Sequence, residues 1–304
     1  MSILDKFSFF PLPDLGRFEV IAQPEGKGKG FWAGGCSSLK DDKGKIWLAY
    51  RLRNPEKRGH KVCIAASQDG VNFQTVKELH KKDFSNIESL ERASLLQDPY
   101  TGKYKLYLSL EREKKWYIYK LEDVTSPEKF DPSTAKSVFA PSSETKDSRK
   151  VKDPYIVNFF NTWHMFYSGS GKEPQEQTFL ATSQDGLQWA RKGTVLKRSS
   201  WHDYHTRMSC LIPTKRGFIF LYEGSSFSWY EPHFNLNVGF GYTVDMRNFF
   251  DLTTQGPILS SFRGGNFSTL RYIDYVFLEE RFLFYYEAAR NDDAFELRVT
   301  EFEV

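Results

Sequence analysis

Acidic and basic side chains gather at two kinds of position in this 304-residue sequence, just before or just after short apolar segments. Those before such segments are Glu91-Arg92, Lys152-Asp153 and His205-Thr206-Arg207; those after them are Arg51, Arg53, Glu111, Glu223, Glu287 and Arg290. Carboxylates confined together with arginines cannot all keep ordinary pKa values, because repulsion raises some and guanidinium groups lower others. Cleavage of a glycosidic bond needs such a split, with one carboxyl protonated as acid and one ionised as base or nucleophile.

A sequence repeat supplies the elements that can bring these positions together. Five aromatic segments recur at intervals of about 55 to 64 residues, at 46–50, 104–109, 163–167, 218–222 and 282–286. The motif Ser67-Gln68-Asp69-Gly70 also returns as Ser183-Gln184-Asp185-Gly186. A fixed period indicates one supersecondary unit copied along the chain. Five copies built from short strands predict an all-β fold, a five-bladed β-propeller.

The strand order within a blade predicts which residues meet. The first two strands of each blade are antiparallel neighbours, so the start of the first lies beside the end of the second at one mouth of the ring. We therefore expect Glu91, Asp153, Glu223 and Glu287 to point into one central cavity, with Arg92 and Arg207 among them. Asp69 and Asp185 fall on the opposite face, where Asp-Gly is typical of a tight turn.

The repeat predicts a single domain over residues 1–304, with a lead-in at 1–30 and five blades at 31–304. The fifth blade lacks an outer strand at the C-terminus, whereas residues 17–21 belong to no blade. Pairing of residues 18–21 with residues 296–302 would close the ring and remove an open edge.

Composition limits the partners and the location. The net charge is only +3 and both signs are interspersed, which disfavours a nucleic-acid partner. No apolar run approaches the ~20 residues of a membrane span, and the N-terminus lacks the features of a signal peptide. Three cysteines without metal-ligand spacing are typical of reduced thiols, so we expect a cytoplasmic protein without a cofactor. His202 and His205 could ligate a metal together with Asp203, but an ordinary hydrogen-bonded loop is the preferred interpretation.

Two stretches resemble known carbohydrate-active enzymes. Lys152-Asp153-Pro154-Tyr-Ile-Val, followed by Trp163-His-Met-Phe-Tyr-Ser-Gly169, resembles the Arg-Asp-Pro strand of the five-bladed propeller glycosidases: arabinanases, xylosidases, levanases and invertases. Ala49-Tyr50-Arg51, with Ile64-Ala-Ala-Ser-Gln-Asp-Gly70 and Phe73, is more similar to the mannoside phosphorylases. The resemblance covers about residues 31 to 304 and implies a carbohydrate substrate.

The resemblance also implies roles for single residues. Asp153 matches the Asp of the family's Asp-Pro motif, as base or transition-state stabiliser, and Glu223 is the best match to its acid. Many members place an Asp at the start of the first blade, where this chain has Ala33-Gly34-Gly35-Cys36. Either Glu91 or another residue at the mouth takes that role, or the chemistry differs.

Three functional interpretations remain open. The first is a glycoside hydrolase with Asp153, Glu223 and Glu91 as catalytic candidates. The second is a phosphorylase, in which Arg51, Arg53, Arg92, His205 and Arg207 bind inorganic phosphate; the same set suits a carboxylated sugar. The third is a sugar-binding propeller without catalysis. Glu287 and Arg290 at the mouth are further substrate-binding candidates, as is Trp201, whose ring could stack on a sugar or cover a blade edge.

Overall fold

The computed structural model describes residues 11–230, 235–263 and 267–303, and strands dominate it. Its helical elements are short: α1 (Phe227–Tyr230) and the 3-10 turns η1 (Lys81–Asp83), η2 (Pro127–Lys129) and η3 (Pro132–Thr134). Within the described part of the chain, no helix is long and apolar enough to span a membrane. The fold is therefore all-β, as the sequence predicts.

Antiparallel pairing sorts the described strands into five groups of four, which we number in chain order. Group one is β2 (Trp32–Lys40), β3 (Ile46–Asn54), β4 (Arg58–Ser67) and β5 (Gln74–His80). Group two is β6 (Ser89–Gln97), β7 (Tyr104–Arg112), β8 (Lys115–Lys120) and β9 (Lys136–Phe139). Group three is β10 (Lys150–Phe159), β11 (Thr162–Ser170), β12 (Gln177–Ser183) and β13 (Ala190–Thr194).

The last two groups follow the same plan. Group four is β14 (His205–Thr214), β15 (Gly217–Ser225), β16 (Asn237–Thr243) and β17 (Phe249–Asp251). Group five is β18 (Leu270–Leu278), β19 (Arg281–Ala289), β20 (Phe295–Glu303) and, from the other end of the chain, β1 (Glu19–Ala22). β1 is antiparallel to β20, with Glu19 opposite Val299 and Val20 opposite Arg298. The expected pairing between the two ends of the chain is thus confirmed.

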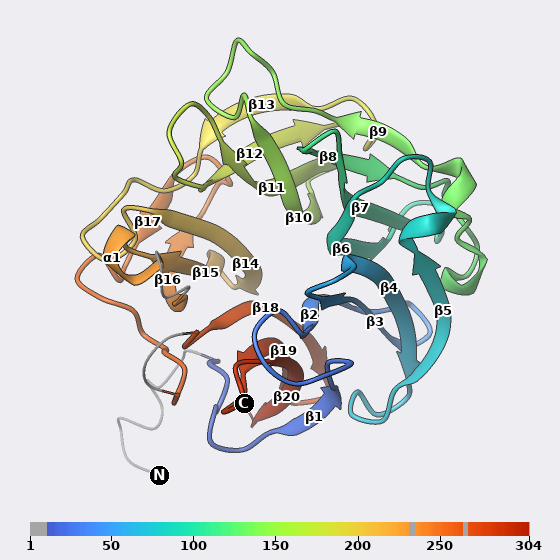
Figure 1. Cartoon of the computed structure of the whole chain (residues 1–304), viewed down its shortest axis with the longest axis horizontal. Coiled ribbons are helices and arrows are strands. Elements are labelled where there is room, and N and C mark those ends of the chain that lie inside the picture. The colour runs from blue at the N-terminus through green and yellow to red at the C-terminus, as the bar shows by residue number, and fades with distance from the viewer. Residues whose placement is uncertain (1–10, 231–234, 264–266, 304) are drawn as a thin grey trace.

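The groups surround a common centre (Figure 1), and β2, β6, β10, β14 and β18 lie nearest to it. These innermost strands contact one another in the cyclic order β2, β6, β10, β14, β18 and back to β2. Short parallel bridges join four pairs of groups: Trp32 pairs with Phe295, Lys150 with Trp116, Glu176 with His205, and Leu236 with Thr269. The innermost strands therefore lie close together around this centre.

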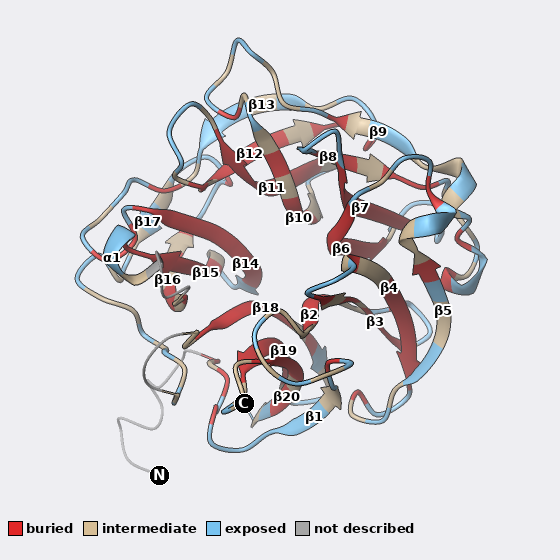
Figure 2. Ribbon diagram, in the orientation of Figure 1, coloured by how far each residue is buried: buried red, intermediate tan, exposed pale blue. Residues whose placement is uncertain are grey.

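Apolar contacts between neighbouring groups form the core. Between groups one and two, Trp47, Val62 and Ile64 pack with Leu106 and Leu108. Figure 2 shows the same trend throughout, with buried inner strands and more exposed outer ones. The aromatic segments of the repeat form the second strand of each group, where large rings fill the space between stacked sheets.

The repeated Ser-Gln-Asp-Gly motif forms turns, as expected. The Asp69 carboxylate accepts hydrogen bonds from the backbone N–H groups of Val71 (2.9 Å) and Asn72 (2.8 Å). Asp185 does the same for Leu187 and Gln188, at 2.8 Å each. Both carboxylates are occupied in shaping the turn, on the face away from the starts of the innermost strands.

Candidate active site

All five innermost strands carry a register irregularity near their starts. It lies between Gly34 and Ser37, Leu90 and Ala93, Lys152 and Tyr155, Met208 and Cys210, and Arg271 and Asp274. A β-bulge re-aims the side chains of a strand and is frequent next to active sites. Three residues within these bulges have a left-handed backbone: Gly35 (φ 62°), Asp153 (φ 56°) and Tyr272 (φ 54°). The repeated bulge presents residues of every group to the centre.

Asp153 is buried at this centre and ionised. Its Oδ2 accepts a hydrogen bond from Arg207 Nη1 at 2.8 Å, and Lys152 Nζ lies 3.6 Å away. Burial alone would raise the pKa of Asp153, but the charges of Lys152 and Arg207 lower it to about 2. Ser109 Oγ accepts the backbone N–H of Asp153 at 2.7 Å. Within the described residues, the buried Oδ1 has no hydrogen-bond partner, so its capacity as an acceptor is unused.

Glu223 is fully buried beside Asp153, but its oxygens are occupied. Oε2 accepts hydrogen bonds from Nε (2.8 Å) and Nη2 of Arg207, which lies opposite Glu223 across β14 and β15. Oε1 accepts from the Ser209 hydroxyl (3.0 Å) and from the Tyr272 backbone N–H. A general acid needs a proton and access to the leaving oxygen. Glu223 instead holds Arg207 in place.

The Glu287 carboxylate lies against the glycines near the start of β2. Its Oε2 accepts the backbone N–H of Gly35 at 2.9 Å, and a Cβ on Gly34 would collide with the carboxylate. Arg51 Nη2 (3.1 Å) and Arg271 Nε (2.9 Å) also bind Glu287. The glycines of β2 therefore make room for a carboxylate that arrives from β19.

Glu91 lies at the rim of the centre between two arginines. Arg51 Nε binds its Oε2 at 2.6 Å, and Arg53 Nη1 binds its Oε1 at 3.2 Å. Burial opposes ionisation of Glu91, but Arg51 and Arg53 outweigh it and lower the pKa. Arg53 is half-buried, so this part of the network borders on solvent.

A second rim cluster joins Lys152, Glu176 and His205. Glu176 lies 3.5 Å from Lys152 Nζ and 3.9 Å from His205 Nδ1. Burial and the nearby Arg207 lower the pKa of His205 to about 3, so its ring is neutral at pH 7. Glu176 is absent from the sequence-based set. It directly precedes β12, and the start of a third strand lies at the same mouth as the end of the second, so strand order would have found it.

Tyr272 contacts four arginines of the site, and the sequence analysis did not predict it as a site residue. Its ring centroid lies 3.9 Å from the guanidinium of Arg207, 5.1 Å from that of Arg271, and 5.6 Å from those of Arg51 and Arg92. Aromatic faces attract guanidinium groups. The sequence places Tyr272 next to Arg271 near the start of β18, and this position could have identified it as a residue of the site.

Arg92 has a structural role in this arrangement. Its guanidinium donates to the backbone carbonyls of Cys36 (3.3 Å), Met208 (3.1 Å) and Ser209 (2.9 Å). It thereby ties β6 to β2 and β14 across the centre. Three backbone partners leave it few donors for phosphate or a sugar carboxylate.

Two expected substrate-binding residues lie elsewhere. Trp201 is only 3% exposed; its Nε1 donates to the Thr253 carbonyl at 2.5 Å and its ring stacks on Tyr222 at 5.7 Å. This corrects the assignment of Trp201 as a sugar-stacking residue, because its faces are covered by the core of group four. Arg290 is paired with Asp292 at 3.0 Å, just after β19. His202 bonds Asp251 at 2.8 Å rather than joining His205.

The fold is that of known carbohydrate-active enzymes. One similar solved structure is a β-1,2-mannobiose phosphorylase from Listeria innocua in complex with β-1,2-mannobiose, with TM-score 0.65 and 14% identity over 96% of this chain and 92% of that chain. A structure from a study of glycoside hydrolases within the GH130 mannoside phosphorylase family, which target β-1,2 mannosidic linkages in Candida mannan, has TM-score 0.66 and 18% identity over 95% of each chain.

A thermostable family-43 glycoside hydrolase is similar as well, with TM-score 0.67 and 13% identity over 93% of this chain and 92% of that chain. No protein-family model matches the sequence, and no curated protein matches it. The resemblance noted in the sequence is thus confirmed at the level of the fold. Identities this low do not carry an activity from those proteins to this chain.

Proposed function

We propose that this protein acts on a glycosidic bond of an oligo- or polysaccharide, at the centre formed by the starts of the innermost strands. We further infer that the five groups are the blades of a closed five-bladed propeller, which the cyclic contacts of the inner strands support. The observation that carries the functional proposal is the Asp153 carboxylate. It is ionised and held through Oδ2, while its buried Oδ1 has no partner among the described residues.

A sugar ring matches what this carboxylate requires. Its hydroxyl groups can donate to Asp153 Oδ1, and its oxygens can accept from Lys152 and Arg53 at the rim. During cleavage the sugar becomes oxocarbenium-like and positively charged, and an ionised carboxylate nearby stabilises that charge. Asp153 acts in this proposal as base or transition-state stabiliser.

Glu91 is the second carboxyl that we propose to face the substrate. It replaces Glu223 as the acid candidate, because the oxygens of Glu223 are bound by Arg207, Ser209 and Tyr272. The rim position of Glu91, beside the half-buried Arg53, gives a bound sugar access to it. Displacement of Arg53 by substrate would free Oε1 of Glu91 and raise the pKa of this carboxyl, while Arg51 stays bound to Oε2.

A second candidate function is carbohydrate binding without cleavage. Two observations favour it: arginines lower the pKa of Glu91 in the free protein, and the oxygens of Glu223 are occupied. Phosphorolysis is the third candidate, since Arg53 and Lys152 at the rim could hold phosphate as the attacking group.

An activity screen separates these functions. Aryl glycosides and oligosaccharides, β-1,2-mannobiose included, are incubated with the protein with and without inorganic phosphate. We expect cleavage by the wild type and a loss of about 10²–10⁴-fold in rate for Asp153→Asn and for Glu91→Gln. Asp42→Asn, in the exposed turn between β2 and β3, serves as the control and should keep full activity.

Phosphate dependence and the activity of the variants distinguish the three functions. Cleavage only with phosphate present would establish phosphorolysis. Binding of an oligosaccharide without cleavage would establish the sugar-binding function. Full activity of both Asp153→Asn and Glu91→Gln would contradict the assignment of the site.

A further inference from the structure

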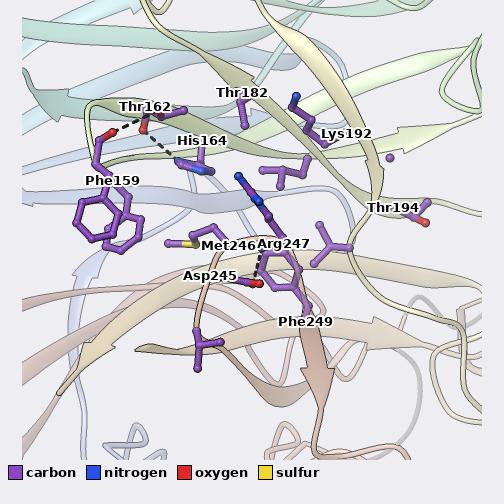
Figure 3. A pocket seen from close by; sticks show the side chains of 15 residues that line it. Phe159, Thr162, His164, Thr182, Lys192, Thr194, Asp245, Met246, Arg247 and Phe249 are labelled. Carbon is purple, nitrogen blue, oxygen red and sulfur yellow. Dashed lines mark hydrogen bonds between the residues drawn. The ribbon is translucent and has the colours of Figure 1, made fainter. Parts of the chain in front are cut away.

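A separate pocket lies between groups three and four, on the face away from the candidate active site. Its volume is about 730 Å³, within the range of small-molecule sites. Figure 3 shows side chains of both groups around it, among them Phe159, His164 and Lys192 from one side and Arg247 and Phe249 from the other.

An exposed aromatic residue with a strained backbone conformation, Phe160, borders the pocket. Phe160 is 84% exposed and has φ 48°, next to Asn161 with φ 57°, in the two-residue turn between β10 and β11. Such turns favour Asn and Gly, and a bulky residue with positive φ is strained. The corresponding two-residue turn between β18 and β19 has polar residues, Glu279 (φ 57°) and Glu280. Strain of this kind clusters at functional positions.

The floor of the pocket contains a second departure from the repeat. The turn Thr243-Val244-Asp245-Met246 stands where groups one and three have Ser67-Gln68-Asp69-Gly70 and Ser183-Gln184-Asp185-Gly186. Met246 takes the glycine's place with φ 56°, and its side chain is buried with Phe166 and Phe249. In the other two turns a Cβ would collide with a tyrosine or leucine of the neighbouring group. The turn of group four thus accommodates the apolar side chain of Met246 at a position where the other two turns need a glycine.

Two cations and one carboxylate, Asp245, line the pocket, so its lining carries a net positive charge. Lys192 and Arg247 line it and are exposed, and within the described ranges neither side chain forms an ion pair. The nearby Asp245 carboxylate is occupied by the backbone N–H groups of Arg247 (2.8 Å) and Asn248 (2.7 Å). Burial lowers the pKa of His164, whose Nδ1 lies 3.0 Å from the Thr162 carbonyl, so the neutral ring leaves Nε2 as an acceptor.

We propose that this pocket binds a small amphipathic organic anion, a carboxylate carried on an aromatic or aliphatic body. The apolar body contacts Phe159, Phe160 and Phe249, and the carboxylate lies between Lys192 and Arg247. The combination of an exposed ring with two cations against a single carboxylate matches this class of ligand, since apolar contact supplies affinity and a few polar groups fix orientation.

The test is a calorimetric titration with 3-phenylpropionate, its neutral amide 3-phenylpropionamide, and propionate, which lacks the ring. We expect 3-phenylpropionate to bind, and each of the other two to bind about tenfold more weakly or not at all, as the loss of one charge-assisted contact or of the ring's burial implies. Lys192→Gln with Arg247→Gln should weaken binding about tenfold. Lys43→Gln, on the exposed turn between β2 and β3, is the matched control and should bind as the wild type does.

Phe160→Asn gives a second, independent measurement. Asparagine tolerates the left-handed turn and removes the ring. The variant should therefore unfold at the same or a higher urea concentration than the wild type, yet bind 3-phenylpropionate more weakly. Equal affinity for acid and amide, unchanged binding by the charge-removal variant, or no binding of 3-phenylpropionate would each overturn the proposal.

Discussion

Arginines determine which carboxylates of the central site are free to meet a ligand. Arg207 donates two hydrogen bonds to Oε2 of Glu223 and one to Oδ2 of Asp153, and the buried Oδ1 of Asp153 has no partner among the described residues. The sequence could place these residues at one mouth, because strand order alone decides which ends meet. It could not show which oxygens are occupied, because that depends on side-chain geometry between blades.

Glu223→Gln should destabilise the fold rather than act on chemistry alone. Glu223 is fully buried, and its removal leaves the Arg207 charge with Asp153 as its remaining carboxylate. Breaking a buried ion pair from one side costs about 3–5 kcal/mol. Urea unfolding at pH 7 measures the loss. Glu279→Gln, in the turn between β18 and β19, should change stability by less than about 0.5 kcal/mol, and an equally small effect of Glu223→Gln would contradict the described network.

Asp274 should make stability depend on pH in the direction opposite to that of a salt-bridged carboxylate. Burial raises its pKa from 3.8 to about 6, although Arg92 and backbone N–H groups oppose the shift. Between these values the folded protein keeps a proton that the unfolded chain has released, so stability falls as pH rises through this window. Above pH 6 the total loss is about 3 kcal/mol, at about 1.4 kcal/mol per pKa unit.

Asp274→Asn removes that titration. The unfolding free energy of the variant minus that of the wild type should therefore increase by about 2–3 kcal/mol between pH 4 and pH 7.5. Urea unfolding of both proteins at each pH measures it. Other groups that titrate in this range, such as His205, are common to both proteins and cancel in the difference. A difference that stays constant with pH would show that Asp274 has an ordinary pKa.

At the level of elements, the repeat predicts the second strand of every group, because an aromatic, apolar segment recurs there at similar intervals. The outermost strands β9 and β17 have only four and three residues, too few for a recognisable alternating pattern. The five bulges escaped it too, since a bulge is defined by pairing with a second strand. These bulges set the direction of Asp153 and Tyr272, so the detail of the site depends on a feature that the pattern does not encode.

Removal of β1 should weaken group five. Besides its pairing with β20, the N-terminal segment places the carbonyls of Asp14 and Arg17 within 2.9 Å and 2.6 Å of Thr300 Oγ1. A chain that begins at residue 23 should lose at least about 2 kcal/mol of unfolding free energy, since each hydrogen bond is worth about 1 kcal/mol. A chain that begins at residue 11 keeps these contacts and is the control. Equal stability of the two shortened chains would rule out a closing role for β1.

At the level of the whole molecule, five similar groups contribute residues to one centre. The period of the repeat predicts such an arrangement, and the closed five-bladed ring is our proposal. Differences between groups are what make the two ends of the molecule chemically distinct. One end concentrates paired charges around Tyr272, and the other has the pocket beside Phe160 and Met246. The identity of a sugar or its linkage depends on contacts that the pattern does not specify.

The location of a bound sugar tests the central claim most directly. The measurement is a crystal structure of the Asp153→Asn variant with an oligosaccharide that the wild type binds or cleaves. We predict a sugar ring at the starts of the innermost strands, with a hydroxyl in hydrogen-bond contact with the side chain of residue 153 and with Arg53 or Lys152 beside it. An oligosaccharide bound only elsewhere, for example in the pocket between groups three and four, would contradict the account.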